Sequence, residues 1–278
     1  RASGGDAPSR VGSVAMRTGF PAHFFGFGLI FAELLGACCS CPQPTAAAAE
    51  SKAPAAPTSA TLMPSAAASV VAIKTCSGAM VPAADGLIDD LEDNDNRVSQ
   101  IAGRGGYWWA AKDDKGSTIE PIGELKMSEG GAHGSKYALR VSGKTASGEN
   151  AWGSVVGFRI AQNGLYDASK YAGVSFFAKV GDKSTSAVRL KVADVNTHPD
   201  GQVCKDACYN DFGKDFTFGH DWQEYQVSFA EMKQQDGWGD PRPPSITPNE
   251  LVQIAWHLIT PGADFELWLD DVRFTDCQ

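Results

Sequence analysis

The chain has 278 residues, of which 43% are hydrophobic and 21% charged, which is typical of a soluble globular protein with one sizeable core. Residues 76–278 carry 19 basic and 30 acidic side chains, a net charge of −11. This charge argues against nucleic acid as a partner, because the phosphate backbone is bound mainly through Lys and Arg.

The first apolar segment has the layout of a secretory signal. Residues 16–37, MRTGFPAHFFGFGLIFAELLGA, start with a Met and a cationic residue, continue with an apolar run and end in small residues. Met16 is therefore the predicted start, and residues 1–15 are an extension that the natural protein lacks. An uncleaved membrane anchor is the alternative, but the apolar run is shorter than the ~20 residues that a spanning helix needs.

The segment after the signal predicts a lipidated tether. The sequence LGAC at 35–38 resembles the bacterial lipobox, whose cysteine, here Cys38, becomes the lipidated first residue of the mature chain. Residues 38–75 consist mostly of Ala, Pro, Ser and Thr and lack the large apolar side chains that offset the entropy of ordering. We therefore expect a disordered linker, and an exported protein that is either a cell-envelope lipoprotein or extracellular, with the lipid as its only membrane contact.

The domain at 76–278 holds four of the seven cysteines, and an even number in an exported domain predicts disulfides. Of the three pairings, Cys204–Cys208 with Cys76–Cys277 is the most economical, because the first closes a tight loop and the second ties the ends of the domain. A zinc site of four cysteines is the alternative, although the domain contains no C-x2-C pair.

Alternation of apolar and polar residues, rather than helical periodicity, runs through this domain. The predicted strands are YALRVS (137–142), GVSFFAKV (173–180), AVRLKVA (187–193), QEYQVSF (223–229), VQIAWHLI (252–259) and FELWLDDVRF (265–274). A capping box with Pro at the first helical position, at 247–250, is the clearest helix signal. Many strands and few helices predict an all-β, jelly-roll β-sandwich of two antiparallel sheets.

Several motifs occur in an order that carries a resemblance. They are DDLED (89–93), GYWW (106–109), VSFFAKVG (174–181), the loop at 194–213, DWQEYQVSF (221–229) and LWLDDVRF (267–274). Together they resemble the family 11 carbohydrate-binding modules and related galactose-binding-like jelly rolls over residues 85–277. The resemblance implies a non-catalytic β-sandwich that binds β-glucan chains along one concave sheet, often with a structural calcium ion. We expect the protein to be a monomer.

The loop that starts DVNTHPDGQVCKDACYNDFG at residue 194 is too long to be a simple connection. We interpret it as a binding loop that a disulfide holds shut beside a sugar groove. Asp194 and Asn196 are its candidate ligand-binding residues because they follow directly on a strand, and Tyr209 is a candidate for stacking on a sugar. Calcium held by Asp194, Asn196 and Asp200 is the alternative, without the Gly and bidentate Glu of an EF-hand.

Sugar binding also needs flat aromatic rings and planar polar groups on an exposed sheet surface. The outward phase of the predicted strands supplies these candidates: Phe177, Arg189, Lys191, Gln253 and His257. Trp256, by contrast, shares the phase of the apolar residues around it, so we expect it to pack in the core.

Three acidic residues are candidates for the structural calcium ion that the resemblance implies. Asp90 and Glu92 share one strand phase, and Asp270 follows the apolar Leu269 in the last predicted strand. Carboxylate oxygens are the ligands that Ca²⁺ prefers, and ligands from the two terminal strands would cross-link the sandwich. The alternative is that these acids are exposed turn residues.

Enzyme signatures are missing, since the sequence contains no GxSxG, HExxH, P-loop or dinucleotide-binding motif. Together with the resemblance, which implies β-glucan as the ligand, this predicts binding of a polysaccharide without chemistry. A glycoside hydrolase on the same sandwich is the first alternative, because a sequence so rich in acids can supply two facing carboxylates. A structural envelope protein that binds another protein is the second.

Overall fold

The computed structural model describes residues 71–278. The predicted extension at 1–15, the signal at 16–37, Cys38 and most of the linker at 38–75 lie outside the described residues, so the lipid anchor and export stay predictions. Among the described residues, no helix is long and apolar enough to cross a membrane.

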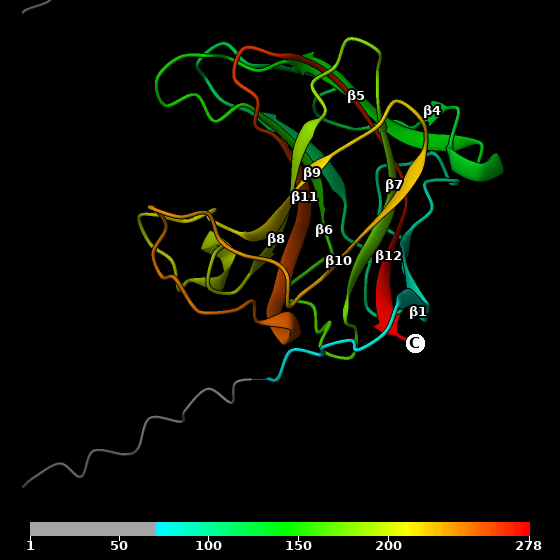
Figure 1. Cartoon of the computed structure of the whole chain (residues 1–278), viewed down its shortest axis with the longest axis vertical. Helices are drawn as coiled ribbons and strands as arrows, with labels where there is room; N and C mark the ends of the chain where they lie inside the picture. The colour runs from blue at the N-terminus through cyan, green and yellow to red at the C-terminus, as the bar shows by residue number, and fades with distance from the viewer. Residues whose placement is uncertain (1–70) are drawn as a thin grey trace, which may run out of the picture. The chain divides into compact units, whose positions relative to one another are not determined.

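Twelve strands form two antiparallel sheets in the described part of the chain (Figure 1). The first sheet has the order β10-β7-β12-β5-β3, with β1 paired to β12 and β4 to β5. Its strands are β1 (Met80–Asp89), β3 (Thr118–Glu120), β4 (Ser128–Glu129), β5 (Tyr137–Lys144), β7 (Gly173–Val180), β10 (Gln223–Ser228) and β12 (Asp264–Cys277).

The second sheet has the order β2-β6-β11-β8-β9. Its strands are β2 (Trp108–Lys112), β6 (Ser154–Arg159), β8 (Ala187–Asp194), β9 (Phe212–Thr217) and β11 (Leu251–Leu258). All strand pairs in both sheets are antiparallel, and the predicted jelly-roll β-sandwich is confirmed. The remaining regular elements are three short 3₁₀ helices, η1 (Ala132–Gly134), η2 (Pro199–Gly201) and η3 (Pro248–Glu250).

The core lies between the sheets and follows the predicted alternation. Trp256 on β11 is fully buried, as its phase predicts, and packs against Phe176 of the opposite sheet with 5.2 Å between ring centroids. Trp108 on β2 stacks on Trp256 at 6.0 Å. Because these rings fill the space between the sheets, the residues of opposite phase on each strand face outward.

The expected helix at 247–250 is shorter than a capping box suggests. It is the single 3₁₀ turn η3, and the side chain of Thr247 makes no capping hydrogen bond. The backbone of the turn joins β11 at once, because Leu251 is already extended.

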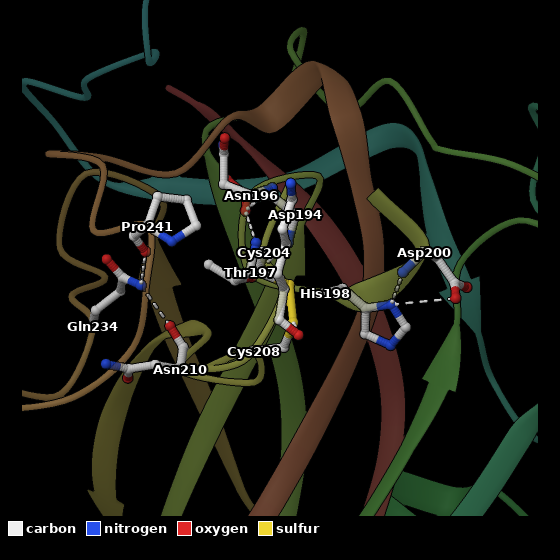
Figure 2. The surroundings of a disulfide bond; sticks show 11 residues. Asp194, Asn196, Thr197, His198, Asp200, Cys204, Cys208, Asn210, Gln234 and Pro241 are labelled. Atoms are coloured by element: carbon white, nitrogen blue, oxygen red, sulfur yellow. Dashed lines mark hydrogen bonds and ion pairs between the residues drawn. A yellow bond between two sulfur atoms is a disulfide. The ribbon is translucent and has the colours of Figure 1, made fainter. Parts of the chain in front are cut away.

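Both predicted disulfides form, Cys76–Cys277 and Cys204–Cys208. Cys277 also pairs through the backbone with Met80 of β1, so the first bond closes the two ends of the domain beside their strand pairing. Because all four cysteines of the domain are in these disulfides, the alternative prediction of a zinc site made of four cysteines is wrong. The second disulfide lies in the loop after β8 (Figure 2).

Candidate functional site

A cavity of about 880 Å³ lies over the outward face of the sheet β2-β6-β11-β8-β9. We call it the groove. Its lining comes from β2, β6, β8 and β11, from the residue before β2, from the loops before β6 and before β9, and from the loop after β10. These lining residues are Tyr107, Trp109, Ala111, Trp152, Val155, Arg159, Lys191, His198, Cys208, Tyr209, Asp211, Gln235, Trp238, Gln253, Ala255 and His257.

The floor of the groove has two small residues, Gly157 and Ala255, at the centre of a row that runs across the strands in register. Trp109 of β2 is paired with Gly157 of β6, Gly157 with Ala255 of β11, Ala255 with Lys191 of β8, and Lys191 with Gly213 of β9. A Cβ on Gly157 would lie 2.6 Å from the Cβ of Ala255, so this position tolerates only glycine. With 4.7–4.9 Å between neighbouring strands, this row crosses the sheet over roughly 19 Å.

Planar polar side chains border the floor on both sides. On one side Arg159 of β6 is paired with Gln253 of β11. On the other, His257 of β11 is paired with Val155 of β6, and both line the groove. Amide, guanidinium and imidazole groups can each donate or accept hydrogen bonds with neighbouring sugar hydroxyls, so the border suits a polyhydroxylated ligand.

Aromatic rings form the walls. In the described part of the chain eight large hydrophobic side chains are exposed, and four of them line the groove: Tyr107, Trp152, Tyr209 and Trp238, between 43% and 52% exposed. Trp109 adds a fifth, half-buried ring. Exposed apolar side chains that gather in one cavity mark a binding surface rather than scattered surface residues.

The loop after β8 places Tyr209 on the wall through three contacts. The backbone of Tyr209 has a positive φ of 72° and donates its N–H to the carbonyl of Thr197 at 2.7 Å. The carbonyl of Tyr209 accepts a hydrogen bond from Nζ of Lys191 at 2.7 Å, and the ring packs edge-on against His198. The preceding residue, Cys208, belongs to the disulfide (Figure 2).

One carboxylate lines the groove among the described residues. Asp211 is 2% exposed, and its Oδ2 lies 3.2 Å from Nζ of Lys191. Arg159 forms an ion pair with Asp200 of η2. The cations that face the groove are therefore neutralised by acids at its edge, which leaves their remaining N–H groups as hydrogen-bond donors.

Four of the eight predicted binding residues line the groove: Lys191, Tyr209, Gln253 and His257. Lys191, Gln253 and His257 were identified by their outward phase on β8 and β11, and Tyr209 by its position in the stapled loop.

Asp194 and Asn196 do not line the groove. Asp194 is fully buried, and its carboxylate accepts the backbone N–H groups of Asn196, Thr197 and Thr247, while burial raises its pKa. The side-chain amide of Asn196 donates to Oγ1 of Thr247 at 2.9 Å. These two residues therefore fix the start of the loop against η3, whereas Asp200 pairs with Arg159.

Arg189 and Phe177 also lie outside it. Arg189 is 5% exposed and is held by Asp215, at 2.7 Å, and by the carbonyl of Lys233, at 2.6 Å. Phe177 lies on β7 of the other sheet, where its ring packs against His133. Strand phase predicted correctly that Phe177 faces outward, but phase cannot tell which of two sheets a strand joins.

Sequence reasoning missed most of the aromatic walls. Tyr107 and Trp109 alternate with the buried Trp108, so the phase of GYWW contained a signal for them. Trp152 and Trp238 lie in loops, where no periodicity marks which side chains turn toward the sheet.

The three predicted calcium ligands lie around one loop. Asp270 is fully buried and accepts the N–H of Ala132 at 2.7 Å. Glu92 accepts hydrogen bonds from Ser135 and Tyr137, and Asp90 accepts one from the N–H of Glu92. In residues 71–278 no group of three or more His, Cys, Asp and Glu side chains is placed to hold a metal ion. Calcium at these carboxylates stays a prediction.

Removal of calcium tests it. If Glu92 and Asp270 share an ion, a chelator should lower the melting temperature of the protein by several degrees, because a ligand that binds only the folded state adds to its stability. Differential scanning calorimetry with and without excess EDTA measures this shift. An unchanged melting temperature, or a shift that Glu92→Gln does not reduce, contradicts a calcium site.

His257 makes stability depend on pH. Burial and the nearby Lys191 lower its pKa from 6.5 to about 4, and its Nε2 contacts the carbonyl of Trp152, so the neutral ring donates from Nε2. As the pH falls below about 6.5 the unfolded chain takes up the proton first, so the His257 contribution makes unfolding easier down to about pH 4, by at most about 3 kcal/mol. Burial raises the pKa of Asp89 to about 7 and that of Asp270 to about 6, so these two carboxyls act in the opposite direction.

Urea unfolding at neutral pH and near pH 4.5 measures this loss. His257→Gln keeps a donor for Trp152 but does not titrate, so it should lose less stability than the unsubstituted protein over the same interval. An equal loss in both proteins would assign the pH dependence to other groups.

No family model matches this chain, and no curated protein matches it. Among solved structures, a family 11 carbohydrate-binding module from Clostridium thermocellum in complex with a β-1,3-1,4-mixed-linked tetrasaccharide has a TM-score of 0.47 and 14% identity, over 70% of this chain and 98% of that one.

Two further structures extend the likeness. A family 30 module of a cellulosomal cellulase from Clostridium thermocellum has a TM-score of 0.44 and 14% identity, covering 66% and 97% of the two chains. A family 4 module has 0.41 and 19%, covering 69% and 99%. The solved structures to which the chain is similar thus include carbohydrate-binding modules of families 11, 30 and 4. Family 11 is the family that the sequence motifs resemble.

Proposed function

We propose that the domain binds a polysaccharide chain in the groove without converting it. The observation that carries this proposal is the groove over the sheet, where Gly157 and Ala255 lie side by side and five aromatic rings form the walls. Aromatic faces pack against the apolar faces of sugar rings, and the two small residues leave room for those rings above the sheet.

The shape of the groove favours a chain over a compact small molecule. The groove extends over β2, β6, β11 and β8, and aromatic rings stand at the β2 edge, in the loop before β6, in the loop before β9 and in the loop after β10. Rings spaced along a groove can contact successive sugar units. The proposed ligand is β-glucan, on the strength of the sequence motifs that resemble family 11 modules.

The polar groups support binding without hydrolysis. Glycoside hydrolases use two carboxyl groups that face the scissile bond from opposite sides. Among the described residues that line the groove, Asp211 supplies one carboxylate, and that carboxylate is buried against Lys191. The groove therefore offers hydrogen bonds and stacking but no facing pair of acids.

Isothermal titration of the full chain tests the proposal. The ligands are mixed-linkage β-glucan, xylan and galactomannan, and the same samples are assayed for released reducing sugar. Saturable heat with β-glucan and no released sugar supports the proposal. Released sugar would favour a glycoside hydrolase, and no heat with any of the three glycans would overturn polysaccharide binding and favour a protein partner.

A further inference from the structure

The wall of the groove beside β9 is built from two separate segments. Tyr209 belongs to the loop before β9, and Trp238 belongs to the loop after β10. Both rings are about half exposed, at 52% and 43%, so neither is held in place by burial of its own side chain. Something else must fix the two rings relative to each other and to the floor.

The side chain of Asn210 joins these two segments. Asn210 follows Tyr209 directly and is 2% exposed. Its Nδ2 donates to the carbonyl of Gln235 at 2.8 Å and to the carbonyl of Trp238 at 2.5 Å, and its Oδ1 accepts the N–H of Gln235 at 2.9 Å. The side chain thus uses both donors and its acceptor on the loop that carries Trp238.

The backbone around Asn210 strengthens the same junction. Its carbonyl accepts a hydrogen bond from Nε2 of Gln234 at 2.8 Å (Figure 2). On one side the two segments form a bridge between Ala207 and Asp240, and on the other between Gly213 and Lys233. Asn210 lies between these bridges, at the centre of the contact.

The loop after β10 approaches Asn210 too closely for a larger residue. A Cβ on Gly239, whose φ is +90°, would lie 2.6 Å from the Cβ of Asn210 and 2.8 Å from its Nδ2. The backbone next to Trp238 therefore rests on the asparagine side chain itself. The packing beside Trp238 thus depends on the Asn210 side chain.

We propose that Asn210 is a positioning residue for the groove: it does not contact the ligand, and it sets Tyr209 and Trp238 in the arrangement that binds the glycan. This inference rests on the proposed function. An alanine would remove the Asn210 donor from the carbonyl of Trp238 and one of the two donors from the carbonyl of Gln235, which also accepts from Arg242. It would also remove the acceptor of the Gln235 N–H, and together these losses favour a rearranged loop. Aspartate has the same shape and keeps the acceptor but loses both donors.

The experiment measures glycan affinity of the full chain with Asn210→Asp and Asn210→Ala. We expect each to weaken binding of mixed-linkage β-glucan at least tenfold. Ser184→Ala is the control, because its side-chain hydroxyl also joins two segments, through the N–H of Glu266, but lies outside the groove. The control should bind within twofold of the unsubstituted protein, even if its melting temperature falls.

A double-mutant cycle separates positioning from a general loss of structure. In a Tyr209→Ala/Trp238→Ala background, Asn210→Asp should change affinity by less than twofold, because the rings through which it acts are gone. A tenfold loss that persists in this background would overturn the proposal. So would affinities within twofold of the unsubstituted protein for both Asn210 variants.

Fluorescence tests the same contact without any ligand. Acrylamide quenching of the unsubstituted protein minus that of Trp238→Phe gives the quenching of Trp238 in the native loop. Quenching of Asn210→Asp minus that of Asn210→Asp/Trp238→Phe gives the quenching of Trp238 when Asn210 is changed. We expect Trp238 to become more accessible to quencher. If the unsubstituted protein binds no glycan, the proposed function fails, and unchanged quenching of Trp238 would overturn the role of Asn210 separately.

Discussion

Trp109→Ala is expected to weaken binding of mixed-linkage β-glucan about thirtyfold or more, a loss of about 2 kcal/mol or more of binding free energy. Trp109 stands at the end of the small-residue floor, paired with Gly157, so its ring is the wall against which a sugar lying on that floor would pack. Isothermal titration measures the affinity.

The neighbouring residue shows why this loss should be in binding rather than in folding. Trp108 is 1% exposed and packs on Phe158 and Trp256, whereas Trp109 points out of the sheet. Trp109→Ala therefore leaves the core intact, and its melting temperature should stay close to that of the unsubstituted protein.

Trp222→Ala is the matched control for Trp109→Ala. Trp222 is half-buried next to β10 of the other sheet, where its Nε1 donates to the carbonyl of Gly130 and Lys179 lies over its ring. The Trp222→Ala variant should have an affinity for β-glucan within twofold of that of the unsubstituted protein. Equal losses in the two variants would contradict the assignment of the groove to the β2-β6-β11-β8-β9 sheet.

The alternation of residues predicts strands and their outward faces, but not the sheet to which each strand belongs. Gln253 and Phe177 both face outward, as predicted, yet only Gln253 lines the groove, because β11 and β7 lie in different sheets. Pairing between strands far apart in sequence decides this, and no local pattern encodes it.

Binding residues at strand ends and in loops are harder to predict, because the same polar side chain can form hydrogen bonds either with the loop backbone or with a ligand. Asp194 and Lys191 lie three residues apart, and the sequence offers both for hydrogen bonding. In the structure the carboxylate of Asp194 turns inward to satisfy three backbone N–H groups, while Lys191 stays on the face of β8. Unpaired backbone donors near a strand end attract the nearest short acid, which explains the difference.

The two disulfides have opposite expected effects on stability and on binding. Replacing Cys76 and Cys277 together by serine should lower the free energy of unfolding by about 5 kcal/mol, because the bond closes a loop with a sequence separation of 201 residues and its loss frees the unfolded chain. The same change at Cys204 and Cys208, whose separation is 4, should cost about 2 kcal/mol. Urea unfolding of the two double variants measures both values.

Binding should reverse the order. Cys76–Cys277 joins β12 to the segment before β1, in a sheet that does not form the groove, so its loss should leave glucan affinity within twofold at temperatures where the variant is folded. Cys208 lines the groove and precedes Tyr209, so the loss of Cys204–Cys208 should weaken binding several-fold. If Cys76–Cys277 proved less stabilising than Cys204–Cys208, the loop-closure explanation would be wrong for this domain. The strand pairing of Met80 with Cys277 would then be enough to hold the two ends together.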